Sequence, residues 1–140
     1  MSKPEAVSPY ATDDALKRAW RVQAAMSARG FDWPDVQGVL DKVKEEVGEI
    51  EDAVDGGDVD HARRELGDLL LVTINLARFL GADPARALHA AVDVFENRCQ
   101  MLEDVLSRRG LKMESCTLAQ LDSVWEEVKV LAAQGRDSGA

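Results

Sequence analysis

The sequence has few of the residues that several common protein classes require. Among its 140 residues there are two cysteines, Cys99 and Cys116, and neither belongs to a CxxC pair or has a histidine at ligand spacing. We therefore expect neither a zinc site nor a redox motif. No stretch reaches the roughly 18 consecutive apolar residues of a membrane span, and residues 1–12 contain no apolar signal-peptide core. These absences predict a cytoplasmic protein without membrane contact.

Basic residues are scarce as well. The chain has 17 Lys and Arg residues against 26 Asp and Glu residues, which gives a formal net charge of −9 and an isoelectric point near 4.7. This charge repels the phosphate backbone of nucleic acids and anionic membranes, so we expect neither as a partner. Because 46% of the residues are hydrophobic, the chain can build one core, and we predict a single domain over residues 1–140.

Strand signals are missing, whereas helix signals follow one another along the chain. Apolar residues recur at spacings of three and four over residues 36–54, before Gly56 and Gly57. Capping residues and periodicity predict five helices: from a cap at residues 12–14 to Gly30, and over about 36–54, 59–80, 84–109 and 118–133. We predict an all-α antiparallel bundle of about five helices, with mobile ends at residues 1–11 and 135–140.

Two of the predicted helices each carry two carboxylates three residues apart, Glu46 with Glu49 and Glu65 with Asp68. Positions i and i+3 share one face of a helix, so each pair offers two oxygen ligands from a rigid element. On a helical wheel Glu46 lies beside the apolar stripe of its helix, whereas Glu45 points away from it. If the two helices lie side by side, the four carboxylates converge.

Most acidic residues on helices form a solvated surface, and an isolated ExxE or ExxD motif carries little information. Glu45, Glu51 and Asp52 fit that description. Glu65 and Asp68, however, interrupt a strongly apolar helix, where a carboxylate without a partner would be costly to bury. His61 and Asn75 fall on the same line of this helix. A bound cation would supply the missing partner.

The type of ligand indicates the type of cation. Carboxylates without cysteine suit hard cations, so we expect Mg²⁺, with Mn²⁺ as the alternative. A helical di-iron site is the competing interpretation, but it requires Glu-x-x-His pairs. Neither His61 nor His89 has a glutamate three residues earlier, which argues against iron.

Three segments in a fixed order carry a resemblance to a known family. Residues 30–35 read GFDWPD, residues 42–49 read KVKEEVGE, and residues 65–78 read ELGDLLLVTINLAR. Together, over roughly residues 15–130, they resemble the MazG nucleoside triphosphate pyrophosphohydrolases, whose pattern is EExxE, a spacer, and then EExxD. The resemblance implies an all-α enzyme that hydrolyses NTPs or dNTPs to the monophosphate and pyrophosphate with the help of Mg²⁺.

The resemblance also implies roles for individual residues. The metal ligands would be Glu46, Glu49, Glu65 and Asp68, and Glu45 would be a weaker candidate for taking the proton of the attacking water. A cation held there would screen the triphosphate, orient it and lower the pKa of a bound water.

The sequence departs from the family pattern in two places. Arg64 stands where the family usually has the first glutamate of its second pair. In the next helix relatives resemble KAxxKFxxRF, whereas this chain has Ala90, Val92 and Val94 where polar residues are expected. Arg98 is what remains there of the set expected to bind phosphates, so affinity or substrate choice could differ.

The substrate-binding candidates are two residues for the base and three for the phosphates. Trp33 would stack on the base and Asn75 would make a polar contact; the alternative for Trp33 is a packing residue that anchors its turn. Lys42, Arg98 and Lys129 are candidates for the phosphates. The alternatives are a solvated side chain for Lys129 and an ion pair with another helix for Arg98.

Two functions from different classes remain open. The first is a house-cleaning enzyme that hydrolyses non-canonical or damaged nucleotides, which the intact carboxylate quartet favours. The second is a catalytically weakened module that binds nucleotide or a protein and regulates it. The absence of the two lysines of the KAxxKFxxRF pattern, replaced here by Ala90 and Val94, favours this function. A third interpretation is a dedicated dUTP- or dCTP-type hydrolase, which would use the same hydrolysis chemistry with a different base-binding pocket.

Because the helix over residues 59–80 is apolar around most of its circumference, we also predict a homodimer or a dimer of dimers.

Overall fold

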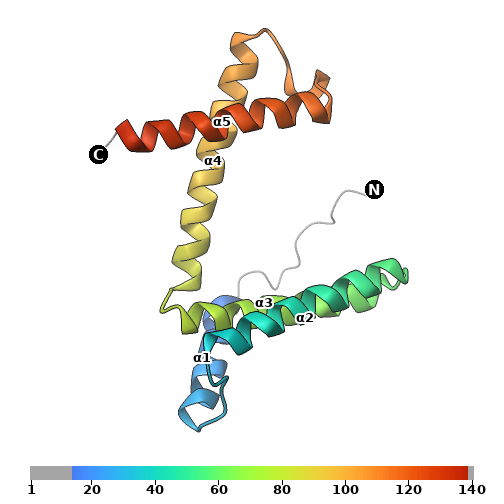
Figure 1. Cartoon of the computed structure of the whole chain (residues 1–140), viewed down its shortest axis with the longest axis vertical. Coiled ribbons are helices and arrows are strands. Elements are labelled where there is room, and N and C mark those ends of the chain that lie inside the picture. Colours follow the sequence, from blue (N-terminus) through green and yellow to red (C-terminus); the bar gives the residue numbers. More distant parts are fainter. Residues whose placement is uncertain (1–13, 139–140) are drawn as a thin grey trace. The chain divides into compact units, whose positions relative to one another are not determined.

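A computed structural model describes residues 14–138, and within that range the chain is all-α (Figure 1). The five α-helices are α1 (Ala15–Ala28), α2 (Val36–Asp55), α3 (Val59–Phe79), α4 (Pro84–Arg108) and α5 (Leu118–Ser138). A short 3₁₀ turn, Met113–Ser115, which the sequence did not predict, precedes α5. The predicted all-α class with five helices is therefore confirmed. No helix in the described part of the chain is long and apolar enough to cross a membrane.

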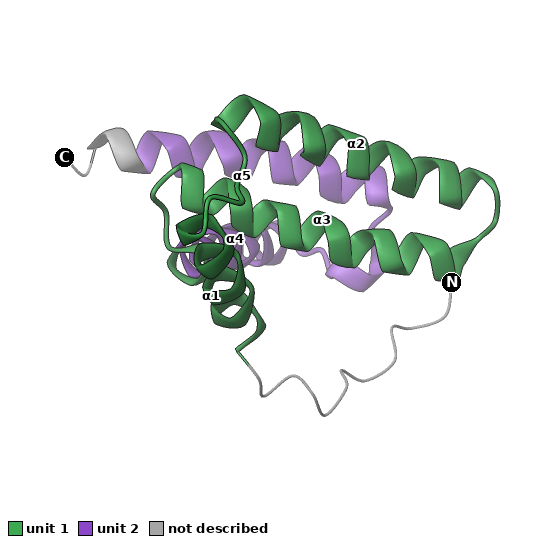
Figure 2. Cartoon of the chain, turned by 90° about the horizontal axis from the view of Figure 1, so that it is seen from below, with its two compact units in different colours: residues 1–86 green, residues 87–140 purple. Residues whose placement is uncertain are grey.

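The chain divides into two compact units, residues 1–86 and 87–140, which are shown in different colours in Figure 2. In the first unit α2 and α3 lie side by side as a helical hairpin, and α1 packs against α3. The hairpin turn places Gly57 in the left-handed region, with φ of 72°, a conformation that costs glycine little. Asp58 then caps α3, because its side chain accepts a hydrogen bond from the His61 backbone N–H at 3.0 Å.

The second unit contains most of α4 together with α5. Its core consists of Leu102, Leu106, Val124 and Val128, and Trp125 packs against that core. The start of α5 is a reciprocal cap: Thr117 Oγ1 accepts from the Gln120 N–H at 3.2 Å, and Gln120 Oε1 accepts from the Thr117 N–H at 2.8 Å.

The predicted end of the last helix is wrong. Instead of stopping near Ala133, α5 continues to Ser138, and the predicted mobility of residues 135–140 stays a prediction. Gly135 does not adopt a positive φ, so it leaves the helix intact, and the alanines before it favour helix. The predicted mobile end at residues 1–11 lies outside the described residues.

Candidate active site

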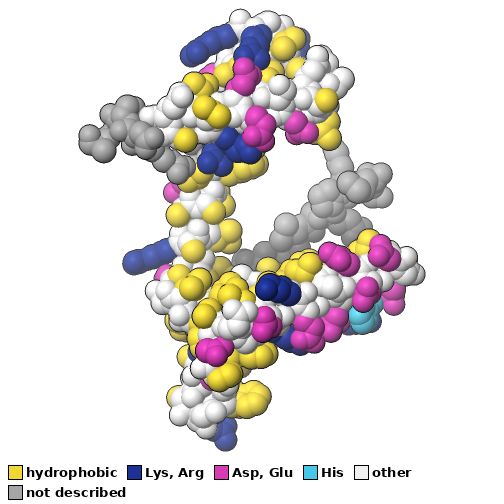
Figure 3. Space-filling view, in the orientation of Figure 1, with side chains coloured by type: hydrophobic (Ala, Val, Ile, Leu, Met, Phe, Trp, Pro, Cys, Tyr) yellow, Lys and Arg dark blue, Asp and Glu magenta, His cyan; other side chains and the backbone are white. Residues whose placement is uncertain are grey.

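Three carboxylates from the α2–α3 hairpin converge. One oxygen from each of Glu46, Glu49 and Glu65 lies within 4.8 Å of the other two. The i, i+3 spacing presents the first two from α2, and the neighbouring α3 of the hairpin supplies the third. Glu46 is 4% exposed and is the one charged side chain that is buried in the described part of the chain. Figure 3 shows the acidic side chains gathered over this hairpin.

Lys42 supplies the positive charge that Glu46 needs. Its Nζ lies 3.0 Å from Glu46 Oε1, one turn along α2, and 3.1 Å from Glu45 Oε1. The ammonium group holds the pKa of Glu46 below its usual range, and the two carboxylates in turn raise the pKa of Lys42 to about 12. Lys42 is therefore engaged within the acidic cluster in this structure and does not present a free ammonium group.

The neighbouring carboxylates disfavour the ionised form of Glu65. The carboxylates of Glu46 and Glu49 raise its pKa to about 7, and desolvation acts in the same direction. His61 Nε2 lies 3.3 Å from Glu65 Oε1. The second oxygens of Glu46 and Glu65, both Oε2, are buried without a hydrogen-bond partner among the described residues. Carboxylate oxygens only accept, so they are satisfied by a hydrogen-bond donor or by a cation, and three converging carboxylates are a donor set that fits a hard divalent cation.

Asp68 is placed differently from the other three predicted ligands. It follows Glu65 by one turn of α3, but its side chain is exposed and does not belong to the converging group. Its role as a ligand stays a prediction. Glu45 is exposed as well, in agreement with the helical wheel, and it contacts the cluster through Lys42.

A second feature of the first unit is a cavity of about 440 Å³ between α1, α3 and the turn that joins α1 to α2. Its walls are mainly apolar, and both base-binding candidates, Trp33 and Asn75, line it together with Phe31. The indole of Trp33 also packs against α2, where a Cβ on Gly38 would lie 3.3 Å from Trp33 Cε3. Trp33 therefore anchors the turn and also forms a cavity wall.

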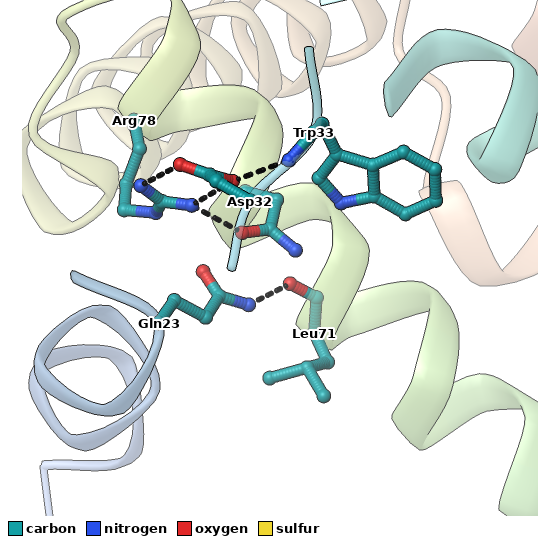
Figure 4. Close-up of polar contacts among 6 residues, drawn as sticks. Gln23, Asp32, Trp33, Leu71 and Arg78 are labelled. Carbon is teal, nitrogen blue, oxygen red and sulfur yellow. Dashed lines mark hydrogen bonds and ion pairs between the residues drawn. The ribbon is translucent and has the colours of Figure 1, made fainter. Parts of the chain in front are cut away.

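A polar network closes one side of this cavity (Figure 4). Arg78 donates to Asp32 through Nη1 at 3.1 Å and through Nη2 at 2.9 Å, and Nη2 also donates to Asn75 Oδ1 at 2.8 Å. The guanidinium group lowers the pKa of Asp32 to about 2. Sequence reasoning missed the roles of Asp32 and Arg78. Both residues stood in motif segments, but nothing in the sequence paired two positions 46 residues apart.

The two remaining phosphate candidates lie in the second unit. Arg98 is half-buried on α4, its Nε is buried without a partner, and it forms no ion pair with any described residue. The predicted alternative for Arg98, an ion pair with another helix, is thus not observed in this part of the chain. Lys129 on α5 pairs with Glu126 at 2.7 Å across an exposed surface.

Comparison with known proteins is consistent with this arrangement. The model of the MazG nucleotide pyrophosphohydrolase domain matches residues 24–103, which is more than half of the chain. The chain is 39% identical over 115 residues to the nucleoside triphosphate pyrophosphohydrolase/pyrophosphatase MazG of Thermotoga maritima. It is 40% identical over 117 residues to the nucleoside triphosphate pyrophosphohydrolase of Escherichia coli K12.

Each of these alignments covers 82% of this chain but only 44% of the relative, so the chain spans less than half the length of these two proteins. A shorter alignment, 33% identical over 67 residues, relates it to the uncharacterized protein YabN of Bacillus subtilis. The predicted resemblance is confirmed, because the family match includes all of α2 and α3 with their converging carboxylates. The chain belongs to the MazG nucleotide pyrophosphohydrolase domain family.

Proposed function

We propose that this chain is a metal-dependent enzyme that hydrolyses nucleoside or deoxynucleoside triphosphates to the monophosphate and pyrophosphate. The observation that carries the proposal is the group of three carboxylates with two buried, unpartnered oxygens, in a chain of the MazG family. The role we assign is removal of non-canonical or damaged nucleotides in the cytoplasm.

Different residues are assigned to the cation, to the phosphates and to the base. Glu46, Glu49 and Glu65, with Asp68, would hold Mg²⁺ or Mn²⁺, which when bound screens the triphosphate charge and acidifies a water molecule. Lys42 limits the negative charge that accumulates at Glu46, so the cluster stays compatible with a polyanion.

Three exposed or half-buried side chains complete this assignment. Glu45, exposed at the edge of the cluster, is the candidate that takes a proton from the attacking water. Arg98 and Lys129 are candidates for the phosphates, and Arg98 already has a guanidinium nitrogen without a partner.

The cavity lined by Trp33 and Asn75 is the proposed site for the nucleobase. Its apolar walls and aromatic side chains suit a flat heterocycle. Asn75 follows Glu65 by ten residues on α3, so about 15 Å along the helix separates the cavity from the converging carboxylates. An extended nucleotide can span that distance, with its base in the cavity and its phosphates at the carboxylates.

A second candidate function is a catalytically weakened nucleotide-binding or regulatory module. It is favoured by Ala90, Val92 and Val94 on α4, whose side chains offer phosphate neither a charge nor a hydrogen-bond donor, and by the engagement of Lys42 and Lys129 in ion pairs. The two functions differ in whether turnover occurs.

The deciding experiment incubates the protein with a panel of canonical, deaminated and oxidised NTPs and dNTPs, with Mg²⁺ or with Mn²⁺, and separates pyrophosphate from phosphate. Metal-dependent release of pyrophosphate is the expected result. Binding of nucleotide without any release, by folded protein, would favour the regulatory module.

We predict that metal binding displaces a proton from Glu65. Because its pKa is raised to about 7, Glu65 is mostly protonated at about pH 6, and Mg²⁺ binding there should release about one proton per site. The affinity for Mg²⁺ should rise with pH through about 7, and proton release should disappear above about pH 8. Calorimetry in two buffers of different ionisation enthalpy measures the release. Equal release by Glu65→Gln would assign the proton to another group.

A further inference from the structure

The amide of Asn75 is held in one orientation. The atom of Asn75 that lies 2.8 Å from Arg78 Nη2 must be the oxygen, because a guanidinium group has donors and no acceptor. Arg78 cannot rotate away easily, since Asp32 accepts two hydrogen bonds from it. The Asn75 NH₂ group is therefore the end left free, and it has no hydrogen-bond partner among residues 14–138.

The acceptors around the same cavity are committed or shielded. Both carboxylate oxygens of Asp32 accept from Arg78, and one also accepts from the Trp33 backbone N–H at 2.8 Å (Figure 4). The amide of Gln23 is fixed by a 2.7 Å hydrogen bond from Nε2 to the Leu71 carbonyl, and its Oε1 is buried out of reach of solvent. Gln23 Oε1 therefore remains as a shielded acceptor without a partner among the described residues, and the Asn75 NH₂ group is the amide donor that this network leaves unpaired.

We infer that Asn75 is a specificity-determining residue that selects bases with a carbonyl oxygen at purine C6 or pyrimidine C4 over bases with an amino group at that position. A carbonyl oxygen of uracil, hypoxanthine or guanine accepts a hydrogen bond from the Asn75 NH₂ group. An amino group of adenine or cytosine would bring two donors together and leave both unpaired in an apolar cavity, which is costly. The inference rests on the proposed function, because it takes this cavity as the base site.

The bases that Asn75 would favour include the products of base deamination. Hydrolytic deamination replaces the amino group of adenine or cytosine by a carbonyl oxygen, giving hypoxanthine or uracil. A donor that is locked in place therefore separates the deaminated nucleotide from its parent at the position where the two differ. Deamination is the class of reaction that supplies the substrates favoured here.

Binding of the monophosphate pairs IMP and AMP, and dUMP and dCMP, tests the inference without depending on hydrolysis. Calorimetry on the full chain should show at least about tenfold tighter binding of the keto member in each pair, the ratio expected for one hydrogen bond made against one lost. In Asn75→Asp one oxygen still accepts from Arg78 and the other presents an acceptor, so the preference should reverse toward AMP and dCMP.

Asn97→Asp is the matched control, because it makes the same chemical change on α4 in the other unit and should leave both ratios unchanged. Ratios near one in the unmodified protein, or unchanged ratios in folded Asn75→Asp, would overturn the inference. Hydrolysis without binding of any of the four monophosphates would also overturn it while the proposed function stands. If the ratios hold but no triphosphate is hydrolysed, the proposed function fails and the inference survives.

Discussion

Replacing Glu46 by glutamine should lower metal-dependent pyrophosphate release by about a thousandfold or more, with the helical fold retained. Glutamine keeps the size of the side chain but removes the negative charge from the centre of the three-carboxylate cluster. Lys42, which lies 3.0 Å from Glu46 Oε1, would then face a neutral amide and repel the incoming cation. Loss of a ligand and gain of an unscreened positive charge act in the same direction.

The matched control is Glu51→Gln, which makes the same chemical change at an exposed position of α2 outside the cluster. Its turnover should stay within about twofold of the unmodified protein, since exposed charges at a distance are largely screened. Initial rates at saturating Mg²⁺, Mg²⁺ affinity by calorimetry and thermal unfolding by circular dichroism separate catalysis, metal binding and folding. Full turnover in Glu46→Gln would remove Glu46 from the site.

The helices could be predicted from the sequence because their signals are local. The period of apolar residues and the glycines after each run placed α2, α3 and α4 within one residue of their observed ends. The same periodicity located Glu46 next to the apolar stripe and turned Glu45 outward, as the structure has them. A helical wheel gives the direction of each side chain around one helix axis. This direction is enough to predict that Glu46 lies near the neighbouring helix once α2 and α3 pack side by side.

The parts that could not be predicted depend on contacts between distant segments. The pairing of Asp32 with Arg78 is fixed by how α3 packs against the turn after α1, and no spacing rule relates these positions. The same limit applies to Asp68: i+3 spacing from Glu65 places both on one side of α3, but only packing decides which of them turns toward α2. The locked amide of Asn75 is a consequence of that tertiary network.

One apolar surface of α3 is exposed within the described residues of the first unit. Leu66 and Leu70, one turn apart, are 50% and 58% exposed, and Val59 is exposed on the same line of the helix. The carboxylate of Glu65 turns to α2 while these side chains point elsewhere. An apolar stripe on a helix that already packs on two sides supports the prediction of a homodimer or a dimer of dimers.

Substituting both leucines, Leu66→Glu and Leu70→Glu, should weaken self-association by about a thousandfold or more. Each buried leucine contributes about 1.5–3 kcal/mol to the free energy of association. In a symmetric dimer each substitution is present on both subunits, so its effect is doubled. The new carboxylates also repel one another across the interface. Sedimentation velocity over a range of concentrations measures the change. Leu118→Glu, which adds the same charge at an exposed leucine of α5, should leave the association unchanged.

The double variant also separates assembly from metal binding. Glu46, Glu49 and Glu65 all come from one α2–α3 hairpin, so a monomeric variant should still bind Mg²⁺ with proton release near pH 6. Loss of metal binding together with dissociation would mean that the second copy completes the carboxylate site. An unmodified protein that stays monomeric at high concentration would contradict the proposed assembly, and the exposed stripe of α3 would then need another partner.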